Sequence, residues 1–393
     1  MAGFATFPAL VPSFQSEWRL SNTQAGWISG IYYAGYMLSA PILTSLTDRV
    51  EPRRILLWGA VLSGVSALAY GLLADGFWLA LILRFVAGMG LAGTFMPGLK
   101  LLSDHTEGPL QSRYLAFYTS SFSIGASTSY FLSGEISATL DWRWSFGLAA
   151  VGSLASVIAI QTLLPTGRFH PAPSSRMLLD FRPVLRTKTA MAYILAYTGH
   201  AWELFSFRSW IVALLAFTQS QQAWGSPWNL TLIAAIVNLL GLPASVCGNE
   251  LAVRFGRRRV ITIIMIASFL VSSVVGFAAS SSAFIVIGLC ILYGVTVMAD
   301  SASLTAGAVE ASPPGHKGAT LAVHSTLGFS AGFLGPLAVG VALDLFGGTG
   351  FAWGIAFIIM GLGSAMGTIA LRIAKPTNKG NQEFRKSGIE FGD

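Results

Sequence analysis

The chain contains eleven apolar stretches of about 20 residues, and this repetition limits its possible folds more than any other feature. A helix of about 20 apolar residues crosses the hydrocarbon core of a bilayer. Only 10% of the 393 residues are charged, against about 25% in an ordinary soluble domain, so the chain cannot cover a water-facing surface. The sequence therefore predicts an all-α membrane protein. We expect helices over residues 24–47, 55–73, 77–102, 114–138, 145–164, 189–217, 229–252, 260–279, 283–308, 319–343 and 350–373.

The first residues, MAGFATFPALVP, are apolar but too short to cross a bilayer. They lack the basic region of a signal peptide. We interpret them as the outer half of a first helix whose inner half is missing. The sequence then predicts twelve transmembrane helices, the first of them truncated.

The positions of the basic residues predict the orientation in the membrane. Of the 24 Lys and Arg residues, twenty lie at loops or helix ends on one side, and only Arg19 and Arg143 lie on the other. Basic residues accumulate in cytoplasmic loops. We therefore expect a multi-pass protein of the cell (inner) membrane with a cytoplasmic C-terminus. The net charge of +7 reflects this orientation and does not indicate a nucleic-acid partner.

One long polar insertion, residues 165–188, divides the chain. It predicts an N-terminal six-helix bundle at 1–164, with its first helix incomplete, and a C-terminal six-helix bundle at 189–373. Residues 374–393 are polar and form a predicted cytoplasmic tail.

The two predicted bundles contain similar sequences at equivalent positions. TDRVEPRR follows the second predicted helix and AVRFGRRR follows the eighth, with Arg49 matching Arg254 and Arg54 matching Arg259 at an offset of 205. A basic turn at equivalent points of two six-helix bundles indicates duplication. This layout resembles the major facilitator superfamily along essentially the whole chain. The resemblance implies two bundles related by a pseudo-two-fold axis, working by alternating access as a monomer.

The family's loop signature, G-x-x-x-D-R-x-G-R-R, is partly kept. Thr44 stands where the first Gly belongs, and Val253 stands at the Asp position of the second copy. In the family this loop is thought to latch the cytoplasmic ends of the two bundles. The resemblance assigns that role here to Asp48, Arg49, Arg53, Arg54, Glu250, Arg254, Arg257 and Arg258. The alternative is that the arginines only determine topology.

The seventh predicted helix carries three ionisable residues, His200, Glu203 and Arg208. His200 and Glu203 are three residues apart and so share a helix face, whereas Arg208 is five beyond Glu203 and is not its natural partner. A carboxylate without a partner in the middle of a bilayer is expected to bind a proton, and histidine titrates near neutrality. We therefore predict Glu203 as the proton carrier, with His200 tuning or sharing the proton.

Arg84 opens the sequence RFVAGMGLAG, which resembles the R-x-x-x-G-x-G pattern of proton-coupled carriers in the family. An arginine at bilayer depth costs about 3 kcal/mol or more. It should face water, a counter-charge or a substrate, unless it extends to the membrane surface. Family architecture places the first, fourth, seventh and tenth helices around a central cavity. The candidate cavity residues are then Arg84, His200, Glu203, Arg208 and Asp300.

These residues carry predicted roles. Arg84 and Arg208 would anchor an anionic group of the substrate, together with His200. Asp300 is predicted as a second proton site or the counter-ion of an arginine. Alternatively, Glu203 and Asp300 only neutralise arginines. Trp202 and Asn238 are further substrate contacts or packing residues, and His324, near the cytoplasmic end of its helix, is expected to be solvated.

The leading functional prediction is a proton-coupled secondary transporter of a small anionic solute. The alternatives are a drug or metabolite exporter on the same fold and a non-transporting membrane sensor or assembly protein. We find no Walker A sequence, no paired metal ligands and no nucleophile–base signature. The sequence thus predicts no enzyme, no cofactor, no metal and no nucleotide, and its expected partners are the solute, protons and lipid.

Overall fold

The computed structural model describes residues 1–47, 49–104, 106, 111–164, 181–222 and 228–373. Within these ranges the regular structure is helical throughout, with no strand, so the predicted all-α class is confirmed. Nine helical segments in the same ranges are long and apolar enough to span a membrane: Pro52–Leu73, Phe77–Leu102, Trp142–Leu163, Lys188–Ser220, Leu230–Phe255, Arg257–Phe277, Ala283–Glu310, Lys317–Leu345 and Gly350–Ile373.

Each of the eleven predicted stretches corresponds, to within two residues where it extends past a helix end, to a long helix or, in one case, to two consecutive helices. Their bounds are α3 (Asn22–Leu46), α4 (Pro52–Leu73), α5 (Phe77–Asp104), α6 (Gln111–Thr139), α7 (Trp142–Leu163), α9 (Lys188–Ser220), α10 (Leu230–Phe255), α11 (Arg257–Phe277), α12 (Ala283–Ala299) with α13 (Ser301–Glu310), α14 (Lys317–Leu345) and α15 (Gly350–Ile373). The ninth of these stretches, 283–308, is divided at Asp300, which ends α12 and precedes α13.

The start of the chain forms two short helices, α1 (Thr6–Ala9) and α2 (Val11–Glu17). Phe7 and Phe14 are buried and stack on each other with ring centroids 5.2 Å apart. α1 contacts α3 and α6 of its own part of the chain and α9 of the other part. Residues 4–11 thus lie inside the molecule.

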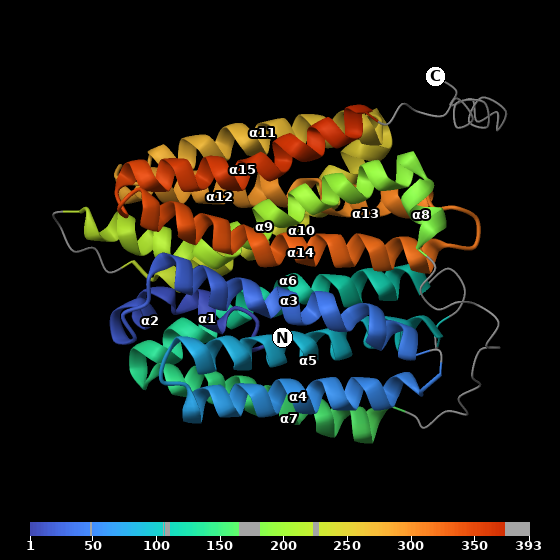
Figure 1. Cartoon of the computed structure of the whole chain (residues 1–393), viewed down its shortest axis with the longest axis horizontal. Coiled ribbons are helices and arrows are strands. Elements are labelled where there is room, and N and C mark those ends of the chain that lie inside the picture. The colour runs from blue at the N-terminus through green and yellow to red at the C-terminus, as the bar shows by residue number, and fades with distance from the viewer. Residues whose placement is uncertain (48, 105, 107–110, 165–180, 223–227, 374–393) are drawn as a thin grey trace.

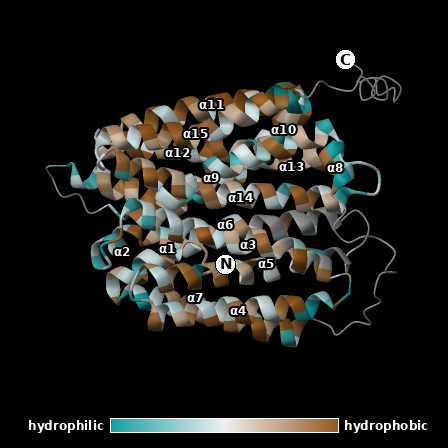
Figure 2. Cartoon of the chain, viewed as in Figure 1, coloured by the Kyte–Doolittle hydropathy of each residue, from teal (hydrophilic) through white to brown (hydrophobic). Residues whose placement is uncertain are grey.

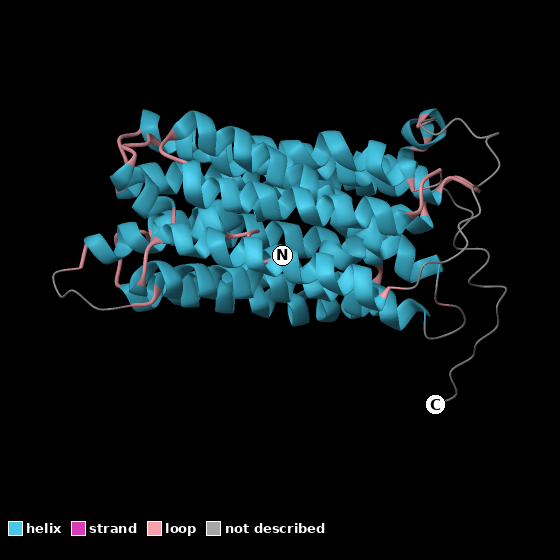
Figure 3. Ribbon diagram, turned by 90° about the horizontal axis from the view of Figure 1, so that it is seen from below, coloured by secondary structure: helices cyan, strands magenta, loops and turns pink. Residues whose placement is uncertain are grey.

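The long helices lie side by side in two groups (Figures 1 and 3). We call α1 to α7 the N-terminal half and α9 to α15 the C-terminal half. The halves meet mainly where α3 packs along α14 and where α6 packs along α10. Apolar residues dominate the middle of the helices, and polar residues gather at both ends (Figure 2).

The two ends of the bundle differ in charge. We call the end that carries Arg53, Arg54, Arg257 and Arg258 the basic end, and the opposite one, where α3 and α10 begin, the far end. The short helix α8 (Arg182–Arg186) lies at the basic end and belongs to the predicted 165–188 connector. Its Val184 is buried against the C-terminal half. Residues 165–180 of that connector and the predicted tail lie outside the described residues.

Candidate functional site

The ionisable residues of the seventh predicted helix are all enclosed by protein. α9 is the most buried of the spanning helices, with 83% of its most apolar window inside the molecule, against 17% for α7. His200, Glu203 and Arg208 are each no more than 3% exposed. Their surroundings are therefore other helices and not lipid.

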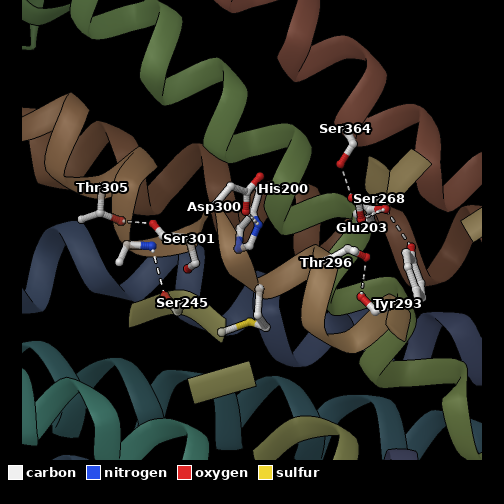
Figure 4. Close-up of polar contacts among 12 residues, drawn as sticks. His200, Glu203, Ser245, Ser268, Tyr293, Thr296, Asp300, Ser301, Thr305 and Ser364 are labelled. Carbon is white, nitrogen blue, oxygen red and sulfur yellow. Dashed lines mark hydrogen bonds and ion pairs between the residues drawn. The ribbon is translucent and has the colours of Figure 1, made fainter. Parts of the chain in front are cut away.

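Glu203 sits in a shell of hydroxyl groups from three other helices (Figure 4). Its Oε1 accepts hydrogen bonds of 2.9 Å from Ser268 of α11 and of 2.9 Å from Tyr293 of α12. Its Oε2 accepts from Ser364 of α15. Glu203 therefore points into the interior of the C-terminal half.

His200 pairs with Asp300 and not with Glu203. Its Nδ1 lies 2.7 Å from Oδ1 of Asp300, and both side chains are buried (Figure 4). The expectation of a shared His200–Glu203 proton is therefore not reproduced as a direct contact. Two residues on one helix face point the same way, but Asp300, at the joint of α12 and α13, supplies a closer partner.

Arg208 lies at the border between the halves. Its Nε donates to Oδ1 of Asn238 over 2.8 Å, and its guanidinium carbon is 5.8 Å from the ring centre of Phe122 in the N-terminal half. The Tyr130 hydroxyl of α6 donates to its backbone carbonyl. Asn238 in turn donates to the carbonyl of Ala234 on its own helix, α10, so the bond from Arg208 is the one that joins α9 to α10.

Arg84 of α5 is 2% exposed and lies inside the N-terminal half. This burial contradicts the alternative that its side chain extends to the membrane surface. Its Nη1 donates to the carbonyl of Gly3 over 3.4 Å, and its guanidinium carbon lies 4.2 Å from the ring centre of Tyr32. The groove around Arg84 is a cavity of about 280 Å³ lined mostly by apolar and hydroxyl side chains of α3, α4, α5 and α7.

The ion pairs among the described residues join neither Glu203 nor Asp300 to an arginine. These ion pairs therefore give no support to the alternative that both acids only neutralise arginines. The acids are held by hydroxyls and by a histidine, and they lie within one half.

Aromatic rings connect the two arginines. The Phe4 ring lies 5.7 Å from that of Tyr32, which contacts Arg84, and 4.9 Å from that of Phe122, which contacts Arg208. An aromatic face attracts a guanidinium and leaves its donors directed elsewhere. The two cations thus flank an aromatic cluster of the N-terminal half, with Arg208 reaching it from the C-terminal half.

Trp202 was predicted as a substrate contact or a packing residue. Its indole nitrogen donates to the carbonyl of Ile359 on α15 over 2.9 Å. The side chain therefore fixes α9 to α15, and the structure favours the packing alternative.

His324 is the polar residue that sequence reasoning placed wrongly. It is 3% exposed and not solvated. Its ring stacks on that of Tyr197 with centroids 3.7 Å apart, and its Nε2 lies 3.3 Å from the Thr305 hydroxyl. The position of His324 near a helix end suggested that its side chain is exposed to water, but α9 and α13 cover this face of α14.

The predicted latch residues bond within their own halves. Arg53 donates to the carbonyls of Ile160 and Gln161 at the end of α7, and Arg54 pairs with Glu51. In the C-terminal half, Arg254 forms an ion pair with Glu250 at 2.8 Å, and Arg257 forms one with Glu310 at 2.7 Å.

Two further latch residues form no ion pair within the part of the chain that the structure describes. Arg49 and Arg258 enter none of the ion pairs of the described residues. Asp48 lies outside the described residues. The latch role stays a prediction.

A family model now decides the identity of this helical bundle. The model described as Major Facilitator Superfamily matches residues 1–336 and 206–390, two overlapping segments that together cover almost the whole chain. The chain belongs to the major facilitator superfamily. It is therefore a multi-pass membrane protein of a transporter family, and the prediction that it is not an enzyme is confirmed.

Known relatives lie at low sequence identity. A sphingosine-1-phosphate transporter of Xenopus tropicalis is 21% identical over 325 residues, which are 77% of this chain and 62% of the relative. Protein spinster homolog 1 of Homo sapiens is 22% identical over 222 residues, which are 53% of this chain and 42% of the relative. The chain thus spans less than two thirds of the length of either relative.

Solved structures support the fold. A bacterial homologue of the human lysosomal transporter Spinster, in an inward-facing and unoccupied conformation, superposes with a TM-score of 0.77 at 14% identity, covering 95% of each chain. The nucleoside transporter NupG superposes with a TM-score of 0.73 at 12% identity, covering 95% of this chain and 98% of that one.

Proposed function

We propose that this chain is a proton-coupled secondary transporter of a small anionic solute, oriented with its basic end in the cytoplasm of a cell whose inner membrane it spans. The observation that carries the proposal is the burial of Glu203 and His200 on one helix, α9, with His200 paired to the equally buried Asp300 at the joint of α12 and α13. Titratable groups at membrane depth are costly and commonly mark proton pathways.

The hydroxyl shell of Glu203 suits both protonation states. Hydroxyl groups donate to a carboxylate when it is charged, and each can accept a hydrogen bond when the carboxyl group holds a proton. A guanidinium in the same place would fix the charged form. The contacts of Ser268, Ser364 and Tyr293 therefore support reversible protonation.

The His200–Asp300 pair supplies a second exchange point. A proton on the imidazole makes the pair an ion pair, and a neutral imidazole leaves a carboxylate able to take the proton itself. Because Asp300 lies at the joint between α12 and α13, a change in its charge acts on the relative position of two helices. This arrangement links proton binding to helix movement.

The two buried arginines support an anionic solute. Arg84 and Arg208 have no acidic partner among the ion pairs of the described residues, and each contacts aromatic rings. Buried cations that lack a counter-ion are stabilised when an anion binds between them. The solute charge would lie close to the border of the halves.

A phosphorylated lipid is the second candidate for the solute. One relative is named as a sphingosine-1-phosphate transporter. In this chain the cavity beside Arg84 is lined largely by apolar residues, including Leu83, Leu91 and Phe146. Such a cavity fits an anionic head group that carries an apolar chain.

Substrate-induced proton movement in proteoliposomes tests the proposal. The panel comprises small carboxylates, inorganic anions and a phosphorylated sphingoid base, with wild type compared with Glu203→Gln. We expect wild-type proton flux with one class of anion, at least tenfold less flux in the variant, and retained counterflow exchange.

Each other outcome of this experiment has a defined meaning. Flux unchanged in Glu203→Gln contradicts Glu203 as the carrier and leaves the His200–Asp300 pair. No flux with any anion contradicts the proposal and favours an exporter of neutral compounds or a protein that does not transport.

A further inference from the structure

We propose that Asp344 and Glu135 are the two matching parts of a gate that closes the far end of the transporter. Each is a carboxylate near the end of a helix in one half, and each accepts a hydrogen bond from the first turn of a helix in the other half. The inference rests on alternating access, which belongs to the proposed function, but not on proton coupling.

The first contact joins α14 to α3. Asp344 Oδ1 accepts from the backbone N–H of Asn22 over 3.0 Å and from its Nδ2 over 2.8 Å, and Oδ2 accepts from the backbone N–H of Thr23 over 2.8 Å. The first N–H groups of a helix have no partner within that helix. Asp344 therefore caps α3 from the opposite half, with its negative charge at the positive end of the helix dipole.

The second contact joins α6 to α10. Asn229 precedes α10 and caps it, because its Oδ1 accepts from the backbone N–H of Leu232 over 2.9 Å. Its Nδ2 donates to Glu135 of α6 in the opposite half. The side-chain amide of Asn22 also contacts both halves. Its Nδ2 donates to Asp344 of the opposite half, and its Oδ1 accepts from Gln15 of its own half over 2.8 Å.

The two contacts occupy equivalent positions of the duplicated bundles. The separation in sequence between Asn22 and Asn229 is about the same as that between Glu135 and Asp344. Both separations are close to the offset of 205 that relates the two basic turns. A glycine allows the approach in both places. A Cβ on Gly340 would lie 2.3 Å from the carbonyl oxygen of Asn22, and one on Gly134 would lie within van der Waals overlap of the Thr231 hydroxyl.

This repetition suits a gate. Opening the far end requires the start of α3 to leave α14 and the start of α10 to leave α6, so both carboxylates must release their asparagines together. Because the four residues lie at the helix ends, water can replace the lost hydrogen bonds. The contacts then bias the conformational equilibrium without fixing it.

Labelling of a cysteine below the gate tests the proposal. Ser209 of α9 is 1% exposed and lies against Tyr33 of the opposite half, so Ser209→Cys becomes accessible from the far end only when the halves separate there. The native Cys247 and Cys290 are first replaced by Ser. The measured quantity is the rate of reaction with a membrane-impermeant maleimide.

We expect Asp344→Asn combined with Glu135→Gln to raise the labelling rate roughly tenfold, and each single variant to raise it less. Asn229→Asp should act in the same direction, because it keeps the cap on α10 but places a second carboxylate against Glu135. Asp141→Asn is the matched control, since Asp141 lies at the far end but pairs with Arg143 of its own half.

A wild-type labelling rate in both the double variant and Asn229→Asp would overturn the gate. Thermal unfolding of each variant in detergent shows whether it is folded, so that misfolding is not counted as opening. Labelling also separates the gate from proton coupling. A faster rate in a protein without proton flux supports the gate and contradicts the proposed function, and the reverse result contradicts only the gate.

Discussion

Arg84 of the N-terminal half and the two buried acids of the C-terminal half lie in different surroundings. In the N-terminal half, Arg84 lies against Tyr32 beside a cavity and has no acidic neighbour among the ion pairs of the described residues. In the C-terminal half, Glu203 and Asp300 are enclosed by hydroxyls and a histidine, away from any cavity described. An unpaired cation next to free space suits binding of an anion, whereas enclosed acids suit the uptake and release of protons.

Breaking the C-terminal pair should have the largest effect. His200→Leu leaves Asp300 without its partner, and Asp300→Leu leaves His200 without its own. Removing one member of a buried pair costs about 3 kcal/mol or more of unfolding free energy, and removing both costs less than the sum. Unfolding of the two single variants and the double variant in detergent measures this coupling. Additive losses would show that the 2.7 Å contact is not an energetic pair.

Removing the N-terminal cation should be the next largest effect. Arg84→Ala is expected to weaken solute binding about 100-fold, because the anion loses a desolvated partner, while Arg84→Lys should lie in between. Counterflow exchange as a function of solute concentration gives the affinity. Arg143→Ala, at an exposed arginine of the same half, is the control. An unchanged affinity in Arg84→Ala would move the solute site out of the N-terminal half.

The contact between the two regions should give the smallest effect. Tyr130→Phe removes the hydrogen bond to the Arg208 carbonyl and is expected to cost about 1 kcal/mol. Tyr36→Phe is a matched control, since Tyr36 is equally buried but its hydroxyl has no hydrogen-bond partner among the described residues. Unfolding midpoints of the two variants compare them directly. Equal midpoints would show that this link between the halves contributes nothing.

Much of the fold was predictable because lipid imposes a simple rule on sequence. A helix must be apolar over about 20 residues to span the bilayer, so hydropathy located all eleven long helical segments. The break at Asp300 could not be predicted in this way, because the stretch Ala283–Glu310 as a whole is as apolar as the other spanning segments. The family, too, was predictable, from basic turns that depend on topology and not on packing.

The site was predictable in its members but not in its pairings. The charges of Arg84, His200, Glu203, Arg208 and Asp300 mark them within apolar sequence. Which of these side chains contact one another depends on how each helix is rotated about its axis. Helical spacing alone suggested that His200 pairs with Glu203, whereas in the structure His200 pairs with Asp300. His324 was misplaced for a related reason, since distance from a helix end says nothing about neighbouring helices.

The burial of α9 limits the substitutions that the chain can tolerate. A lipid-facing helix such as α7 tolerates exchange among Leu, Ile and Val, because acyl chains adapt to any apolar shape. α9 meets close-packed side chains on nearly every face, so even a change of one methylene group leaves a gap or an overlap. Random substitution should therefore be tolerated least in α9, which has the lowest hydropathy of the nine apolar segments. The composition of the bilayer should also affect α9 least directly.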